Sequence, residues 1–261
     1  MKTFIKTYWK TLLFFLAGGL VGGLLLGWDL LASYPADLQQ QILKDIAASG
    51  LGDFPVEAVL GISTALQGAS YALLLGAPGI LIAKKIGLWK DETTLTKRPL
   101  IASLTVAVLG GAGIILPDLL VFNRYSQPLA DLYAVKPSLS YTLGAVIYGG
   151  ILEEVMLRLF TLSLVAFLLH RLLRRKQETV STAVLVAANL IAALLFAAGH
   201  LPNTAILFGG LTSMLLVRCF LLNGAFGLAF GWLYRKYGLR YAMMAHAGCH
   251  VVSKLIWFLF I

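Results

Sequence analysis

Long apolar runs separated by short polar segments make up most of this chain. Most of these runs reach the ~20 residues that cross the hydrocarbon core of a bilayer as an α-helix. Strands of about ten alternating polar and apolar residues, the pattern of a transmembrane β-barrel, do not occur. The sequence therefore predicts an all-α polytopic transmembrane helix bundle of about seven spans. The predicted spans cover residues 11–33, 58–83, 99–123, 139–169, 181–200, 205–236 and 240–261.

Two segments depart from simple spans. Residues 35–50 are too polar to cross a membrane, but Leu38, Ile42 and Ile46 recur at helical spacing. That pattern is typical of an amphipathic helix that lies in the membrane interface. The run 205–236 exceeds one bilayer crossing at ~1.5 Å per residue, so we expect it either to tilt or to break at the Asn-Gly pair 223–224.

Basic and acidic residues alternate between successive connections. Lysines precede the first span, acidic residues dominate 37–57, and basic residues cluster at 84–98, 170–176 and 235–240. With seven spans every basic cluster falls on one side, which the positive-inside rule makes cytoplasmic, together with the N-terminus. The cationic and then apolar N-terminus resembles a signal peptide, but no small-x-small cleavage site follows. We predict an uncleaved first helix in a multi-pass protein of the cytoplasmic membrane.

Composition agrees with a membrane protein. Of 261 residues, 59% are hydrophobic and 13% are charged, whereas soluble domains carry roughly 25% charged residues. The net charge of +9 does not indicate nucleic-acid binding, because membrane topology explains where the basic residues lie. Cys219 and Cys249 lie in apolar runs without CxxC spacing and are interpreted as free thiols.

Ionisable side chains inside spans are candidates for function, because burying them in lipid is costly. Glu154 and Arg158 are four residues apart, share a helix face and are expected to form an ion pair. Glu153 points about 100° away and has no evident partner. A lone carboxylate in such a place suits a general base. A structural salt bridge between helices is the alternative.

Three histidines lie in two further spans. His200 ends the span 181–200, and Pro202 is expected to stop the helix there. His246 and His250 are four residues apart and point the same way, which is the spacing of a metal half-site. Hydrogen bonding between helices is the alternative. Imidazole and carboxylate together can activate water directly or through a metal, and they can also form the proton relay of a transporter.

The other polar and small residues in spans receive structural interpretations. Asp118 is expected to cap a helix or face the interface, Arg218 to neutralise a buried carboxylate, and Lys254 to extend its ammonium to the interface. The glycine-rich runs at 18–23 and 110–113 are expected to be helix-packing surfaces.

In order and spacing these residues resemble the CPBP family of CAAX proteases and bacteriocin-processing (Abi-type) enzymes, which includes type II CAAX prenyl endopeptidases. The family's EExxxR pattern corresponds to EEVMLR at 153–158, and its FxxxH pattern to FAAGH at 196–200. The stretch GLAFGWLYRKYGLRYAMMAH, ending at His246, resembles the family's G-x-x-x-G-x-x-Y-x-x-T-G-x-L sequence, with Tyr237 in place of threonine. The resemblance covers roughly 140–255, and the preceding helices match only as generic membrane helices.

The resemblance implies an intramembrane endopeptidase, a hydrolase acting on membrane-borne or lipid-modified peptides. Glu153 and His200 would activate water for attack on a peptide carbonyl. His246 and His250 would stabilise the oxyanion of the tetrahedral intermediate. Glu154 and Arg158 would position the others.

His250 stands where the family has asparagine, the residue thought to assist oxyanion stabilisation. A histidine N–H can also donate there. Alternatively, Glu153, His200, His246 and His250 would complete a site for Zn²⁺ or another divalent metal, as in a metalloprotease. The resemblance also allows a metal-independent glutamate mechanism, and His250 favours the metal slightly. No HExxH motif is present, which excludes a zincin.

We expect one integral domain, with N-terminal transmembrane helices and the interfacial segment at 1–135 and the catalytic helices at 136–261. A non-catalytic immunity or scaffolding protein of the same fold is the main alternative, for which His250 leaves room. A small proton-coupled transporter is a second alternative and should show paired discontinuous helices or inverted repeats. The expected partners are membrane lipid and a membrane-embedded or prenylated hydrophobic peptide, with no nucleic acid.

Overall fold

The computed structural model describes residues 2–91, 94–173 and 179–261. Within these ranges the regular structure is helical, with no strand. Six helices in this part of the chain are long and apolar enough to cross a membrane, which confirms the all-α polytopic bundle. These helices are α1 (Lys2–Trp28), α3 (Val56–Lys85), α4 (Lys97–Leu120), α8 (Thr182–Gly199) continued by α9 (Leu201–Leu207), α10 (Ser213–Tyr237) and α11 (Leu239–Phe260).

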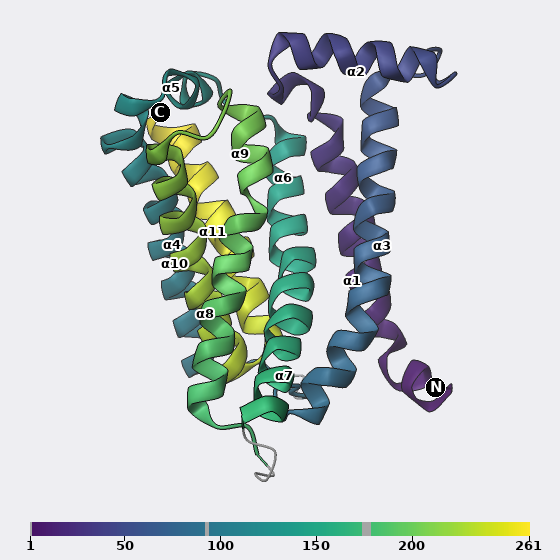
Figure 1. The fold of residues 1–261 in the computed structure, drawn as a ribbon, viewed down its shortest axis with the longest axis vertical. Coiled ribbons are helices and arrows are strands. Elements are labelled where there is room, and N and C mark those ends of the chain that lie inside the picture. Colours follow the sequence, from purple (N-terminus) through teal and green to yellow (C-terminus); the bar gives the residue numbers. More distant parts are fainter. Residues whose placement is uncertain (1, 92–93, 174–178) are drawn as a thin grey trace.

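The remaining predicted span, 139–169, is helical but not a uniform α-helix. It consists of α6 (Leu139–Ile147), η3 (Tyr148–Glu153), η4 (Val155–Leu162) and α7 (Ser163–Leu173). Both η3 and η4 are π-helical, a form with i→i+5 hydrogen bonds that is frequent at functional sites. Figure 1 shows this segment running between the same two ends of the bundle as α3 and α11. All seven predicted runs therefore form helical segments.

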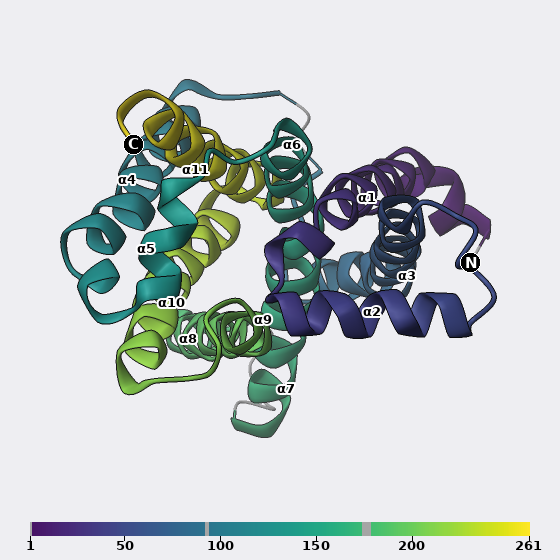
Figure 2. The same ribbon diagram turned by 90° about the horizontal axis from the view of Figure 1, so that it is seen from above.

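The π-helical segment lies in the middle of the molecule. Seen from above, it separates the α1–α3 pair from the group formed by α4, α8, α10 and α11 (Figure 2). Helices α1 and α3 pack on one side of it, and α8 and α11 pack on the other. Its side chains Leu152, Val155, Leu159 and Leu162 are fully buried in the main hydrophobic core. The segment that carries both candidate glutamates is therefore surrounded by other helices.

The glycine-rich runs are helix-packing surfaces, as predicted. A Cβ added at Gly19 would lie 2.5 Å from the carbonyl oxygen of Gly68, so α1 and α3 touch backbone to backbone. A Cβ added at Gly110 would lie 2.3 Å from the sulfur of Cys249, which brings α4 against α11. In both places only a glycine allows the observed approach of the two helices.

Helix starts and turns follow the local sequence. Ser138, Ser181 and Thr212 precede α6, α8 and α10, and each hydroxyl accepts a backbone N–H of the first turn. Gly238 has φ +105° and makes the tight turn between α10 and α11, a conformation that favours glycine. The predicted span 205–236 begins too early, because α10 starts only at Ser213. Helix α10 then continues without a break through residues 223–224.

Helix α2 (Ala36–Ala48) confirms the helix expected at 35–50. Figure 1 shows it lying across the ends of α1 and α3, roughly perpendicular to them. Its predicted apolar residues Leu38, Ile42 and Ile46 are partly buried, whereas most of the helix is exposed. Three short helices were not predicted: η1 (Leu31–Ser33), η2 (Phe122–Tyr125) and α5 (Gln127–Ala134).

The two ends of the bundle carry the alternating charges. The N-terminus, the end of α3 and the turn between α10 and α11 lie at one end, and α2, α5 and the C-terminus lie at the other (Figure 1). Residues 174–176 of the predicted basic cluster 170–176 lie outside the described residues. The basic connections in the described ranges thus share one end, and its cytoplasmic location stays a prediction.

The expectation that Asp118 caps a helix or faces the interface is wrong. Its side chain is fully buried, 2.6 Å from the Nε and Nη2 atoms of Arg218, which confirms that Arg218 neutralises a buried carboxylate. The Tyr133 hydroxyl donates to Asp118 at 2.8 Å. Burial, together with the adjacent carboxylate, raises the pKa of Tyr133 well above its usual range, so the phenol stays protonated and keeps donating.

Candidate active site

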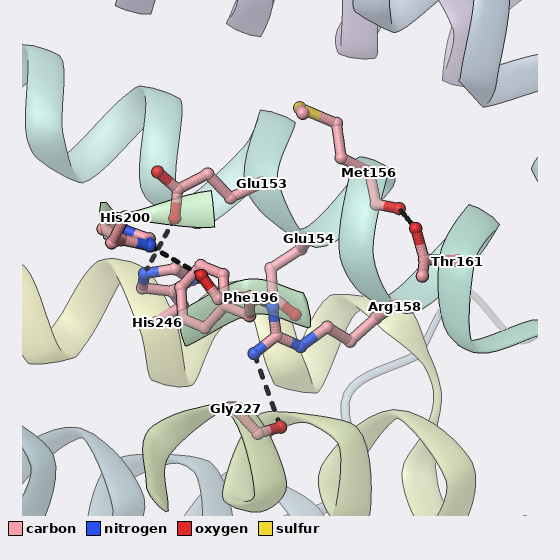
Figure 3. Close-up of polar contacts among 9 residues, drawn as sticks. All are labelled: Glu153, Glu154, Met156, Arg158, Thr161, Phe196, His200, Gly227 and His246. Carbon is pink, nitrogen blue, oxygen red and sulfur yellow. Dashed lines mark hydrogen bonds and ion pairs between the residues drawn. The ribbon is translucent and has the colours of Figure 1, made fainter. Parts of the chain in front are cut away.

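Glu154 and Arg158 form the predicted ion pair inside the bundle. Arg158 Nη1 lies 3.3 Å from Glu154 Oε1, and both side chains are buried. Nη2 donates to the carbonyl oxygen of Gly227 on α10 at 3.4 Å (Figure 3). The guanidinium carbon lies 4.7 Å from the ring centre of Phe196 and 5.3 Å from that of Phe230. The buried cation is therefore held by one carboxylate, one carbonyl and two aromatic faces.

His246 connects the two glutamates. Its Nδ1 lies 2.8 Å from Glu154 Oε1, and its Nε2 faces Glu153 Oε2 at 3.7 Å (Figure 3). The Phe230 ring stacks on the imidazole, with centroids 4.5 Å apart. The Glu154 side chain is 0% exposed and that of Glu153 is 23% exposed. One imidazole thus joins a sealed carboxylate to an accessible one, and the missing partner of Glu153 is His246.

The π-helical winding explains how adjacent glutamates reach one ring. A π-helix has more residues per turn than an α-helix, so consecutive side chains diverge by a smaller angle. Glu154 lies between the two π-helical stretches. One turn later the Thr161 hydroxyl donates to the carbonyl oxygen of Met156, five residues back, at 2.7 Å (Figure 3). The separation of about 100° between Glu153 and Glu154 expected from the sequence applies to an α-helix and is too large for this winding.

His250 lies directly beside His246. The two rings stack with centroids 5.1 Å apart. Both pack on the backbone of η3, because a Cβ added at Gly149 would lie 2.6 Å from His250 Nε2 and 3.2 Å from His246 Nε2. Sequence reasoning did not single out Gly149 or Phe230. The pair of glycines directly before the glutamates was the available signal for the first, and no local signal marked the second.

His200 lies at the junction between α8 and α9, not at the end of the helical segment. Pro202 does not stop the helix, since the Thr204 N–H donates to the His200 carbonyl at 2.9 Å and α9 continues to Leu207. Proline is tolerated in the first turn of a helix because its missing N–H is not needed there. His200 Nδ1 lies 2.8 Å from the Phe196 carbonyl oxygen (Figure 3).

His200 and Glu153, the two residues expected to activate water, form no ion pair with each other among the described residues. In the described part of the chain the histidine that forms ion pairs with the glutamates is His246. His200 borders the same site, because the Phe196 ring lies against both His200 and His246, with centroids 4.7 and 6.0 Å away. The structure therefore gathers the candidate residues in one region and gives the bridging position to His246.

The four candidate metal ligands lie in one region but are not arranged around a common point. No group of three or more His, Cys, Asp or Glu side chains among the described residues is placed to hold a metal ion. The four candidates Glu153, His200, His246 and His250 all lie within those residues. His246 Nδ1 and His200 Nδ1 are engaged by Glu154 and by a backbone carbonyl. A histidine held through Nδ1 in this way can still offer Nε2 to a metal, so Zn²⁺ or another divalent metal stays a prediction from the sequence.

The lead-in sequence before His246 serves to pack α10 on its neighbours. Gly227 accepts the Arg158 hydrogen bond, and a Cβ there would lie 3.0 Å from Ala193 of α8. The Tyr234 hydroxyl is 2.7 Å from the Ser163 hydroxyl, deep in the core. These contacts position α10, and with it Phe230, against the glutamates and His246.

Comparison with known proteins agrees with this site. The family model described as type II CAAX prenyl endopeptidase Rce1-like matches residues 135–252. No curated protein and no solved structure matches the chain. The matched range contains every candidate site residue from Glu153 to His250. The match over residues 135–252, which assemble this site, thus supports a CAAX-type protease of the Rce1-like kind.

Proposed function

We propose that this protein is an intramembrane endopeptidase that hydrolyses prenylated or otherwise membrane-borne peptides with water activated by Glu153 and stabilised by His246. The observation that carries the proposal is the position of His246 between the sealed Glu154 and the accessible Glu153. A general base must be reachable by water and substrate, and the group that orients its partner need not be. Glu153 is accessible and suits the general base, whereas the sealed Glu154 suits the orienting group.

In the proposed reaction a water molecule donates a proton to Glu153 while its oxygen attacks the peptide carbonyl carbon. The carbonyl oxygen becomes an oxyanion, which the Nε2–H of protonated His246 stabilises. Glu154 accepts the Nδ1–H of the same ring and thereby orients Nε2 toward the substrate carbonyl. Glu153 then delivers its proton to the departing amine as the carbon–nitrogen bond breaks. No step requires a metal ion.

Arg158 and His250 have supporting roles in this proposal. Arg158 offsets the charge of Glu154, which would otherwise be an unpaired carboxylate in the core. His250, in the position of the family's asparagine, stacks on His246 and would donate a second hydrogen bond to the same oxyanion. His200 borders this group and would help to position the attacking water.

The test is hydrolysis of a farnesylated CAAX peptide by the protein in lipid nanodiscs. Glu153→Gln should abolish cleavage, whereas Glu57→Gln, which changes a glutamate in the first turn of α3, should leave it unchanged. Cleavage that persists in Glu153→Gln would refute the role of Glu153. A metal chelator should leave the wild-type rate unchanged. A loss restored by Zn²⁺ would instead establish the metalloprotease alternative.

The transporter alternative has less support. A transporter of this kind should contain discontinuous helices, and the break considered at residues 223–224 is not formed, because α10 is continuous there. The alternative of a non-catalytic protein of the same fold predicts equal behaviour of wild type and Glu153→Gln in the cleavage assay.

A further inference from the structure

Lys254 lies on the same face of α11 as the two candidate histidines. It follows His250 by four residues and His246 by eight, so the three side chains are stacked along the helix. Lys254 is 8% exposed. Lys254 also lies just beyond the matched family range, which ends at residue 252.

Two aromatic rings hold the ammonium in place. Nζ lies 4.6 Å from the ring centre of Tyr141 on α6 and 4.8 Å from that of Trp257 on α11. Aromatic faces attract a cation but carry no net charge, so they orient the ammonium without neutralising it. Within the described residues no carboxylate forms an ion pair with Lys254, and no acceptor takes a hydrogen bond from it.

Two arginines inside the bundle have carboxylate partners: Arg158 has Glu154, and the partly buried Arg218 has Asp118. The exposed Lys136, near the same end of α11, donates to the backbone carbonyls of residues 257 and 258 at 3.1 Å. A buried charge without a counter-ion is costly and marks a functional position in a membrane protein. Lys254 therefore has the properties of an anion-binding residue.

We propose that Lys254 binds the C-terminal carboxylate of the peptide substrate. This inference rests on the proposed endopeptidase function. In a CAAX sequence the prenylated cysteine is followed by three residues that end the chain. Hydrolysis at the cysteine therefore leaves three residues, with one free carboxylate, on the leaving side of the scissile bond.

The spacing of the site matches this substrate. Three extended residues reach at most about 10–11 Å. From His246 to Lys254 is eight residues of α-helix, or about 12 Å at ~1.5 Å per residue. A scissile carbonyl at His246 thus places the terminal carboxylate beside the Lys254 ammonium, where it forms a charge-assisted hydrogen bond. Recognition of this carboxylate sets the distance from the cleaved bond to the end of the chain.

The experiment compares a farnesylated CAAX tetrapeptide as free acid and as C-terminal amide, with binding measured on the Glu153→Gln protein in nanodiscs. The acid should bind at least about tenfold tighter, a preference of ~1.4 kcal/mol. Adding Lys254→Met should remove this preference, and Lys254→Arg should retain most of it. Adding Lys136→Met, the matched control, should leave it intact. Binding of the amide serves as the folding control: a correctly folded Lys254→Met protein should bind the amide with unaltered affinity.

Equal affinity of acid and amide for the protein with Lys254, including no detectable binding of either, would overturn the inference. An acid preference that survives Lys254→Met would also overturn it. Turnover separates this result from the proposed function. Cleavage that depends on Glu153 without an acid preference supports the function and refutes the role of Lys254. A Lys254-dependent acid preference without any cleavage supports the role of Lys254 and refutes the proposed endopeptidase function.

Discussion

His246 and Glu154, 92 residues apart in sequence, lie 2.8 Å from each other through Nδ1 and Oε1. The opposite nitrogen of the same ring faces Glu153 at 3.7 Å. One ring therefore gives the two adjacent glutamates different environments: Glu154 is sealed beside Arg158, and Glu153 is accessible. This asymmetry predicts different consequences for two chemically identical substitutions.

Glu153→Gln should reduce turnover by about 10²–10⁴-fold, the usual contribution of a general base. Its effect on the midpoint of thermal unfolding should be small, because the side chain is partly exposed and lies only within ion-pair distance of His246. Parallel turnover and thermal unfolding measurements in nanodiscs check this. A large drop in the unfolding midpoint would show that Glu153 is a structural residue.

Glu154→Gln should lower stability as well as turnover. It leaves the buried guanidinium of Arg158 without its carboxylate, and breaking a buried pair in this way costs about 3–5 kcal/mol. The double variant Glu154→Gln, Arg158→Met should recover part of the stability but none of the turnover, since His246 still lacks its acceptor. An inactive but fully stable Glu154→Gln protein would contradict this account of the ion pair.

Gly149→Ala should impair catalysis by displacing both imidazoles. The added methyl group would lie 2.6 Å from His250 Nε2, so the ring must move away from η3. Gly224→Ala on α10 is the control, because its Cβ meets no atom within 4 Å, and alanine favours the helix by roughly 0.5–1 kcal/mol. We expect at least about a tenfold loss of turnover only for the first variant. Equal rates for both would show that the glycine contact does not position the rings.

Phe230→Leu should lower turnover by about tenfold by removing the ring that stacks on His246 and Arg158. Aromatic contacts of this kind contribute about 0.5–1.5 kcal/mol beyond the burial of area. Phe226→Leu is the matched control, because Phe226 stacks on Phe230 but not on His246. Measured turnover should therefore change in the first variant and not in the second, and similar losses in both would point to general loosening of α10.

Asp118→Asn should destabilise the protein without a specific effect on the site. The change leaves Arg218 buried beside a neutral group, with an expected cost of about 3–5 kcal/mol. Replacing both partners with Leu and Met should restore much of that stability. Thermal unfolding of Asp118→Asn and of the double variant Asp118→Leu, Arg218→Met checks this. An Asp118→Asn protein as stable as the wild type would show that the ion pair is dispensable to the fold.

Hydrophobic patterning and helical spacing in the sequence predicted the helices and the contacts within each one. The apolar runs located all seven helical segments because a membrane demands long apolar helices with internally satisfied backbones. The four-residue spacing predicted the Glu154–Arg158 pair and the shared face of His246 and His250, since positions i and i+4 are neighbours on any helix. Arg218 was correctly expected to neutralise a carboxylate, but the sequence did not identify Asp118.

Only the tertiary structure decided which polar faces meet. His246 reaches Glu154 and Arg218 reaches Asp118 across 92 and 100 residues, and no local rule predicts the pairing of distant helices. The π-helical winding at the glutamates, the continuation of the helix past Pro202 and the aromatic enclosure of Lys254 likewise depend on neighbouring helices. Helical periodicity determines where a side chain points on its own helix, whereas the group that it contacts depends on how glycines and bulky side chains pack the helices together.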